Sequence, residues 1–179
     1  MKFLLFLFII ILSTSCADLK KGDQIEIITE LEKSIDSIST VLIENKLEQI
    51  APIIRQSRTI EKRIVDKFNP DSIIDLETGK KLDAFKEMLN SFDPMEKAYR
   101  DLLKSSKKES VILKELKSDI ENGNGERAKY TEFVAFEVKK VNQLRQLLSD
   151  YVKTKNQSVK TFNTVHEDVN KFSLKLIHY

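Results

Sequence analysis

Apolar residues recur at alternating steps of three and four along three long stretches of the chain, a spacing that places them on one face of an α-helix. The stretches predict helices over residues 24–68, 80–121 and 126–178. In the first stretch, Asn45 and Gln49 interrupt the stripe, which then resumes in a different phase. The apolar stripe positions are Ile28, Leu31, Ile35, Ile38, Leu42, Ile50, Ile53, Ile60, Ile64 and Phe68 in the first stretch; Leu82, Phe85, Met88, Phe92, Met95, Tyr99, Leu102, Leu113, Leu116 and Ile120 in the second; and Tyr130, Val134, Val141, Leu144, Leu148, Tyr151, Phe162, Val165, Val169, Phe172, Leu176 and Tyr179 in the third.

The prolines mark where the first predicted helix bends and ends. Pro52 lies near the phase change, and because a proline removes a backbone hydrogen bond and clashes with the preceding turn, we expect a kink or break over residues 48–52. Asn69-Pro70 ends the stretch, since the residue before a proline is driven out of the helical region. Asp71 or Ser72 can then cap a new start. The residues expected to form one apolar turn that closes this end of the bundle are Ile73, Ile74 and Leu76.

The second stretch keeps its phase across the next proline, Pro94, so we favour one helix that is kinked there. The alternative is two helices, with Asp93 as the N-cap and Pro94 as the first helical position. Gly123 and Gly125 end the stretch in a tight reversal, with glycine available for the left-handed cap and Asn124 to start the next element.

The composition favours helices throughout. Four glycines, three prolines and no tryptophan among 179 residues are typical of a helical bundle or coiled coil. We therefore predict an all-α protein, an elongated antiparallel bundle of three helices, or of four if the second stretch is split, that occupies residues 24–179 as one domain. At 1.5 Å per residue, a helix over residues 126–178 would reach roughly 80 Å.

The first residues have the order of a secretion signal. Lys2 is followed by an apolar run over residues 3–12, then by small residues at 13–15, then by the only cysteine, Cys16. The apolar run has about ten residues, whereas a helix needs about twenty to span the roughly 30 Å hydrocarbon core of a bilayer. We therefore predict a cleaved signal peptide over residues 1–15 rather than a membrane-spanning anchor.

The segment Leu12-Ser13-Thr14-Ser15-Cys16 resembles the lipobox of bacterial lipoproteins, in a loose form similar to that of Bacteroidota. The resemblance implies cleavage before Cys16 and a diacylglyceryl group on this residue, with residues 16–23 forming the lipidated cysteine and a flexible tether. It also implies the outer membrane in a Gram-negative host, because no aspartate directly follows the cysteine. The alternative is an ordinary signal peptide that leaves Cys16 as a free thiol.

The charge balance and the histidines do not indicate nucleic-acid binding or catalysis. The chain has 30 basic and 28 acidic side chains, without the positive excess typical of nucleic-acid binders. His166 and His178 lie too far apart on one predicted helix to share a metal ion. We interpret His166 as a residue that lies beside the apolar stripe, at the seam where the helices pack together, and His178 as solvated. No phosphate-binding loop or catalytic serine motif occurs, so we expect a non-enzyme without catalytic residues, cofactor or metal.

Polar residues occupy stripe positions at two places. Asn45 and Gln49 interrupt the first stripe, and Glu137 and Lys155 fall in the third. A buried amide or charge penalises slipped helix pairing, so the structural interpretation is that these residues fix the register. The functional alternative is a polar notch for a ligand or partner. Ser158 also falls in the third stripe, and we expect looser packing at the polar positions Ser106 and Glu109 of the second.

Charge is uneven along the first predicted helix. Residues 23–48 carry seven acidic and two basic side chains, whereas residues 55–67 carry five basic and two acidic ones. One interpretation is that these charges pair with neighbouring helices. The other is that the acidic part, nearer the lipid, keeps the protein off an anionic membrane while the basic part meets an acidic glycan or protein.

Two copies of Asp-Ser-Ile, around Ser37 and Ser72, resemble the acceptor motif for O-glycosylation in exported Bacteroidota proteins. Ser72 is the better candidate, because a glycan requires an exposed acceptor and Ser37 neighbours the seam. The alternative at residues 71 and 72 is a helix cap.

Together these features predict a membrane-anchored, non-enzymatic lipoprotein of the bacterial envelope, a binding module similar in outline to helical lipoproteins that bind cell walls. Its expected partners are membrane lipid, through acylated Cys16, and a protein or a cell-wall glycan. One alternative is a structural spacer that oligomerises through coiled-coil contacts. Another is a carrier of an apolar ligand, which requires a cavity of about 300 Å³ or more.

Overall fold

The chain folds into helices joined by short connections. The structure, a computed structural model, describes residues 2–69 and 73–177, with side chains from residue 20 onward, and has no strand within these ranges. The predicted all-α helical bundle is confirmed. The helices are α1 (Lys2–Glu44), the 3₁₀ helix η1 (Leu47–Ile50), α2 (Ala51–Lys67), α3 (Leu76–Asn122), the 3₁₀ helix η2 (Arg127–Lys129) and α4 (Tyr130–Lys175).

The contacts divide the chain into two compact units, and each unit is assembled from separate pieces of sequence. Unit 1 comprises Met1–Val41 and Leu103–Gln146, and unit 2 comprises Leu42–Leu102 and Leu147–Tyr179. Unit 1 therefore contains most of α1 with parts of α3 and α4. Unit 2 contains η1 and α2 with the other parts of α3 and α4.

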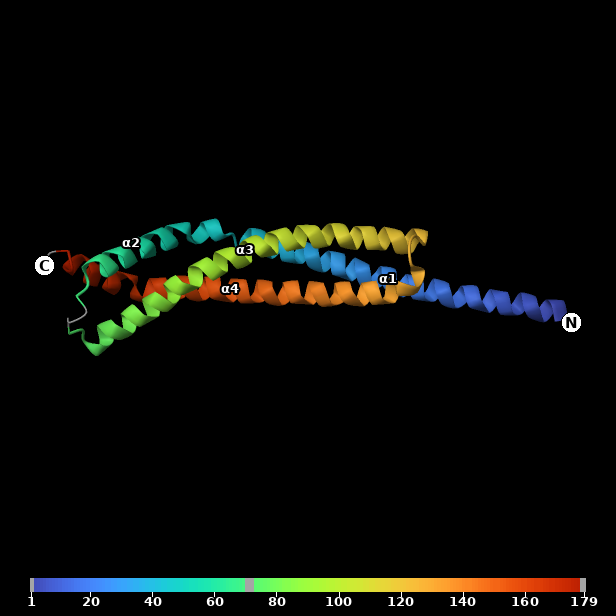
Figure 1. Cartoon of the computed structure of the whole chain (residues 1–179), viewed down its shortest axis with the longest axis horizontal. Coiled ribbons are helices and arrows are strands. Elements are labelled where there is room, and N and C mark those ends of the chain that lie inside the picture. Colours follow the sequence, from blue (N-terminus) through green and yellow to red (C-terminus); the bar gives the residue numbers. More distant parts are fainter. Residues whose placement is uncertain (1, 70–72, 178–179) are drawn as a thin grey trace. The chain divides into compact units, whose positions relative to one another are not determined.

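In unit 1, pieces of α1, α3 and α4 lie side by side (Figure 1). Lys21 Nζ donates a hydrogen bond to the carbonyl oxygen of Glu121 (2.8 Å). Glu32, further along α1, pairs with Lys117, which comes earlier in α3 (2.9 Å), so these two helices are antiparallel. The predicted stripes face one another in the core. Its buried apolar residues are Ile28, Leu31, Ile35, Ile38, Leu113, Ile120, Tyr130, Val134, Val141 and Leu144.

In unit 2, α2 packs with pieces of α3 and α4. The hydroxyl groups of Ser91 and Ser158 are 3.0 Å apart, and Lys81 pairs with Asp168 at 2.8 Å. From the first pair to the second, the position moves back ten residues along α3 and forward ten residues along α4. The two helices are therefore antiparallel, and their register is the same at both pairs. The buried apolar residues of this unit are Leu42, Ile50, Ile60, Phe85, Met88, Leu89, Phe92, Met95, Tyr99, Leu102, Leu148, Tyr151, Phe162, Val165 and Val169.

The first predicted helix is broken, as expected, into α1 and α2. α1 ends at Glu44 and α2 begins at Ala51, so the break starts slightly before residues 48–52. Pro52 stands in the first turn of α2, where its missing N–H group would have no helical partner.

Side chains satisfy the carbonyl groups that α1 leaves open at this break. Gln49 Nε2 donates to the carbonyl oxygen of Glu44 (2.9 Å). The Tyr151 hydroxyl of α4 donates to the carbonyl oxygen of Asn45 (2.6 Å). The break is therefore held by specific hydrogen bonds.

α3 is one continuous helix through Pro94, so the alternative of two helices is wrong. It starts earlier than predicted, at Leu76, because Asp75 caps it. The Asp75 carboxylate accepts hydrogen bonds from the backbone N–H (2.9 Å) and the hydroxyl (2.7 Å) of Thr78, and these bonds lower its pKa. The caps expected at Asp71 or Ser72 lie outside the described residues.

The apolar turn expected to close the end of the bundle does not form. Ile73 is fully exposed and Leu76 is 76 % exposed. The cap at Asp75 directs the chain into α3 before these side chains can turn inward, which explains the difference. Ile74 is half-buried.

The reversal between α3 and α4 contains the two predicted glycines. Gly123 and Gly125 have φ values of +67° and +74°, which glycine adopts without a steric penalty. The backbone N–H of Asn124 donates to the carbonyl oxygen of Asp119 (2.9 Å), which caps the end of α3. The next element starts later than expected, since Glu126 rather than Asn124 is the N-cap of η2.

The structure places residues 17–23, for which we expected a flexible tether, inside α1. The segment has no proline, and its one glycine, Gly22, weakens a helix by only about 1 kcal/mol. Near its end, the bond from Lys21 to α3 and a hydrogen bond from Gln24 to the Thr131 hydroxyl of α4 (3.0 Å) attach α1 to the bundle.

Candidate functional site

Cys16, the predicted lipidation site, lies within α1, ahead of the residues whose side chains the structure describes. Over the described ranges, no helix is both long enough and apolar enough to cross a membrane. The signal peptide over residues 1–15 and the lipid on Cys16 stay predictions.

Three charged side chains of unit 1, Glu109 of α3 with Glu137 and Lys140 of α4, form a buried cluster that we call the carboxylate cluster. Lys140 Nζ lies 2.7 Å from Glu109 Oε2 and 2.8 Å from Glu137 Oε2. Glu109 is 3 % exposed, and its other oxygen, Oε1, is buried without a hydrogen-bond partner. Lys140 also lies over the ring of Phe136, 5.4 Å from its centre.

The electrostatics of the carboxylate cluster favour a proton on Glu109. Burial and hydrogen bonding to Glu137 raise the pKa of Glu109 to about 7, and the contact with Lys140 opposes this only in part. The pKa of Lys140 is raised, because its bonds to both carboxylates outweigh its burial. One lysine charge therefore faces two carboxyl groups, and Glu109 is partly protonated near neutral pH.

A second polar cluster, in unit 2, joins the break after α1 to α4; we call it the Lys155 cluster. Lys155, 5 % exposed, donates to Gln49 Oε1 (2.5 Å) and to Asn45 Oδ1 (3.5 Å). Burial lowers the pKa of Lys155. The neighbouring Tyr151 ring stacks on Tyr99 with 5.4 Å between ring centres. Burial, then Tyr99 and Glu48, raise the pKa of Tyr151 to about 12.

The two clusters bring together polar stripe residues that the sequence placed on separate helices. Asn45 and Gln49 meet Lys155, and Glu137 lies with Glu109. Each set bonds mainly within itself, which supports the interpretation that it fixes the register. Sequence reasoning missed Lys140 and the hydroxyl of Tyr151. The one available signal for Lys140 was its position one helical turn after Glu137, on the same face.

His166 lies on α4, where we expected a residue beside the apolar stripe. His166 is half-buried and packs against Phe162, with 4.3 Å between ring centres. His178 lies outside the described residues. Within the described side chains, no group of three His, Cys, Asp or Glu residues is arranged to hold a metal ion.

Several pockets lie on the surface of the two units. The largest that we describe, about 600 Å³, lies between α3 and α4 of unit 2. Its lining includes Ser91 and Ser158 together with the exposed charged residues Glu87 and Lys153. This mixed, mostly polar lining is not typical of an apolar-ligand site. Another pocket, of about 370 Å³, lies between α2 and α4 and contains His166.

The basic segment of residues 55–67 forms most of α2, and its charges are largely unneutralised. Arg58 pairs with Glu61 (3.1 Å) and with Asp93 of α3 (2.8 Å). In the part of the chain that the structure describes, no carboxylate pairs with the other basic side chains of the segment. These are Arg55, Lys62, Arg63 and Lys67.

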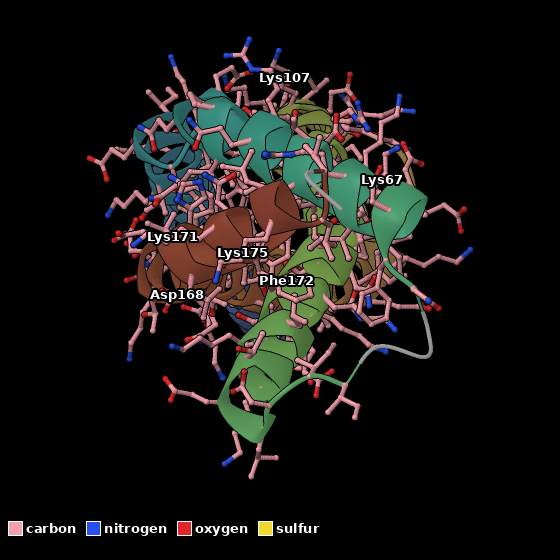
Figure 2. All side chains as sticks on the ribbon, turned by 90° about the vertical axis from the view of Figure 1, so that its left-hand side faces the viewer. Lys67, Lys107, Asp168, Lys171, Phe172 and Lys175 are labelled. Carbon is pink, nitrogen blue, oxygen red and sulfur yellow. The ribbon has the colours of Figure 1, made fainter. Side chains whose placement is uncertain are left out.

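Two lysines near the end of α4 line a separate pocket together with Asp75, Glu77 and Asp168, so acidic groups surround them. Figure 2 shows Lys171 and Lys175 on α4 and Lys67 at the end of α2. Lys171 pairs with Glu167 at 2.5 Å, so it contributes less net charge.

The candidate glycosylation serines lie in different situations. Ser37 is exposed on α1, although the neighbouring Ile38 is buried. Ser72 lies outside the described residues.

Searches with the whole chain found no matching protein-family model, no matching curated protein and no matching solved structure.

Proposed function

We propose that this chain is a lipid-anchored, non-enzymatic binding module of the bacterial envelope. Acylation of Cys16 would attach it to a membrane, the outer membrane in a Gram-negative host. The order of Lys2, an apolar run and small residues before the only cysteine supports this part of the proposal. Two or three acyl chains anchor a protein firmly, since each buried methylene contributes about 0.8 kcal/mol.

The observation that carries the binding part is the unneutralised basic surface of α2. Four of its basic side chains have no carboxylate partner among the described residues, namely Arg55, Lys62, Arg63 and Lys67. Surface cations that are not internally paired attract anionic partners and steer their approach. A glycan or protein with acidic groups is the partner that this surface suits.

A non-catalytic role is supported by the use of the buried polar groups. The carboxylate cluster and the Lys155 cluster each bond one helix to another, and their central side chains, Glu109, Glu137 and Lys155, are buried. Groups used in this way specify which positions of the helices meet, rather than contact a substrate.

Two measurements test the proposal. Mass spectrometry of the N-terminal peptide, from chain purified out of its own envelope, should show diacylated Cys16 as the first residue, and Cys16→Ser should release the protein from membranes. Binding of the full chain to isolated envelope polysaccharide should weaken as salt rises from about 50 to 500 mM, because salt screens charge. An unmodified thiol, or binding that is independent of salt, contradicts the corresponding part.

A spacer that oligomerises is the second candidate, favoured by exposed aromatic residues in unit 1. Phe133 is 39 % exposed and Phe136 is 59 % exposed on α4. Sedimentation of the full chain in detergent should then show a concentration-dependent mass that Phe133→Ser with Phe136→Ser removes. A constant monomer mass contradicts this candidate.

A further inference from the structure

The pocket between α2 and α4 of unit 2 has a volume of about 370 Å³ and a basic lining. α2 contributes Arg55, Thr59 and Arg63, which follow one another at steps of four and so lie on one face of the helix. Gln56 lies beside them, and the buried Ile60 is the only apolar residue of the lining. Polar donors therefore dominate the α2 side.

The α4 side of the pocket adds His166 and Asn170, which also lie four residues apart. Arg63 Nη2 donates to Asn170 Oδ1 (2.8 Å). This bond fixes the amide so that its NH₂ group keeps both hydrogens for another acceptor. The His166 ring is positioned by its contact with Phe162, and an imidazole carries at least one N–H donor whether neutral or charged.

The charges around the pocket leave it positive. No carboxylate lines it, and neither Arg55 nor Arg63 has an ion-pair partner among the described residues. The acidic residues that follow His166 are engaged elsewhere, since Glu167 pairs with Lys171 (2.5 Å) and Asp168 with Lys81 (2.8 Å). Two guanidinium groups thus face the pocket without a counter-charge.

We propose that this pocket binds an acidic sugar unit, with its oxyanion held by Arg55 and Arg63. Guanidinium groups bind carboxylates and similar oxyanions through paired, charge-assisted hydrogen bonds. The amides of Gln56 and Asn170 and the Thr59 hydroxyl suit the hydroxyl groups of a sugar. The volume is that of a small polar ligand. This inference rests on the proposed binding function and gives its partner a chemical class.

The test is titration calorimetry of the full chain in non-ionic detergent with three probes. Trigalacturonate should bind, and neutral maltotriose should not. Inorganic pyrophosphate should bind at least tenfold more weakly than trigalacturonate, because it lacks the hydroxyl groups that the amides recognise. Pyrophosphate that binds as tightly as trigalacturonate, or trigalacturonate that does not bind, overturns the proposal.

The site is located with single and double variants, each of which must first show the same helical circular dichroism as the unaltered chain. Arg55→Ala with Arg63→Ala should weaken trigalacturonate binding at least tenfold. Asn170→Asp, which puts a carboxylate against Arg63 while keeping an acceptor for it, should do the same. Lys160→Ala is the matched control, because it removes a positive charge from an exposed residue of α4 that does not line the pocket, and it should change affinity less than twofold.

An equal loss in Lys160→Ala and in the double variant would mean diffuse attraction to the basic side chains of unit 2 and would overturn the pocket. If the pocket fails while Cys16 is acylated and envelope polysaccharide still binds, the proposed function stands. If Cys16 is unmodified while trigalacturonate still binds, the pocket stands and the lipid anchor of the proposed function fails.

Discussion

Lys155 of α4 places its ammonium nitrogen 2.5 Å from the side-chain oxygen of Gln49, inside the break that separates α1 from α2. Within the described residues no carboxylate pairs with this lysine, although it is almost fully buried. Its pKa is lowered, which means that the two amide oxygens do not compensate for the loss of hydration. The contact therefore specifies where α4 meets the break more than it stabilises the fold.

Lys155→Met is expected to leave the unfolding free energy at pH 7 unchanged or to raise it by about 1 to 2 kcal/mol. The reason is that methionine has a side chain of similar length and removes the buried charge. In the unaltered chain, the folded state binds the lysine proton less tightly than the unfolded state. Stability should therefore rise as the pH approaches the ordinary pKa of 10.5 and level off above it, and Lys155→Met should lose this rise.

Urea denaturation of both proteins between pH 7 and 10.5 measures this difference. The exposed neighbour Lys153 provides the control, as Lys153→Met should keep the rise. A loss of more than 1 kcal/mol at pH 7 in Lys155→Met would mean that the bond to Gln49 outweighs burial.

Tyr151→Phe should lower the unfolding free energy by about 1 to 2 kcal/mol at pH 7, because the carbonyl oxygen of Asn45 loses its donor. The folded-state pKa of Tyr151 is about 12, above the ordinary 10, so the fold resists ionisation. Stability should fall as the pH rises from 10 to 12, and the variant should lose less in this window. Denaturation curves of both proteins at pH 7 and 11 test this prediction. If both proteins lose the same unfolding free energy between these pH values, the raised pKa of Tyr151 is wrong.

Glu109→Gln is expected to stabilise the protein at pH 8 by on the order of 2 kcal/mol and to change it little at pH 4. The folded state holds the Glu109 proton up to a pKa of about 7, whereas the unfolded state releases it near 4.5. The contribution of Glu109 to stability is thus fully present below pH 4.5 and is lost as the pH rises to 7.

Thermal denaturation across pH 4 to 8 tests the Glu109 prediction. The exposed Glu115 of α3 provides the control, because Glu115→Gln makes the same chemical change on the same helix at the surface. If the stability of Glu109→Gln parallels that of the unaltered chain at every pH, the raised pKa of Glu109 is wrong.

Ser57→Ala should stabilise unit 2 by about 1 kcal/mol. The Ser57 hydroxyl is completely buried on α2 and has no hydrogen-bond partner among the described residues, so this side chain carries an uncompensated desolvation penalty. Ser158→Ala is the contrasting variant, since its buried hydroxyl donates to the Thr154 carbonyl oxygen (2.9 Å), and it should destabilise by a similar amount. Chemical denaturation at pH 7 compares the two.

Helix periodicity predicted the buried positions well. Apolar side chains spaced by three and four residues are buried together when the chain forms a helix and packs that face against its neighbours. Ile28, Phe92 and Val141 illustrate this, and all three are buried. Ser57 falls on the same face as Ile53 and Ile60, so the phase of the stripe determined its burial even though its side chain is polar.

The capping and pairing details were less predictable, since they depend on residues brought together by tertiary packing. The start of α3 depends on Asp75, whereas the proline rule drew attention to Asp71 and Ser72. The break at Asn45 was expected from Pro52, but its closure by Tyr151 requires the register between α1 and α4. Likewise, the polar pocket of Arg63 and Asn170 joins residues that are far apart in sequence.

Neither unit is a continuous piece of sequence, because each takes one portion of α3 and one of α4. The core of either unit cannot close until its portion of α4 is present, so neither unit can finish folding from its α1, α2 and α3 portions alone. For the same reason, no single continuous stretch of the chain contains one whole unit without part of the other.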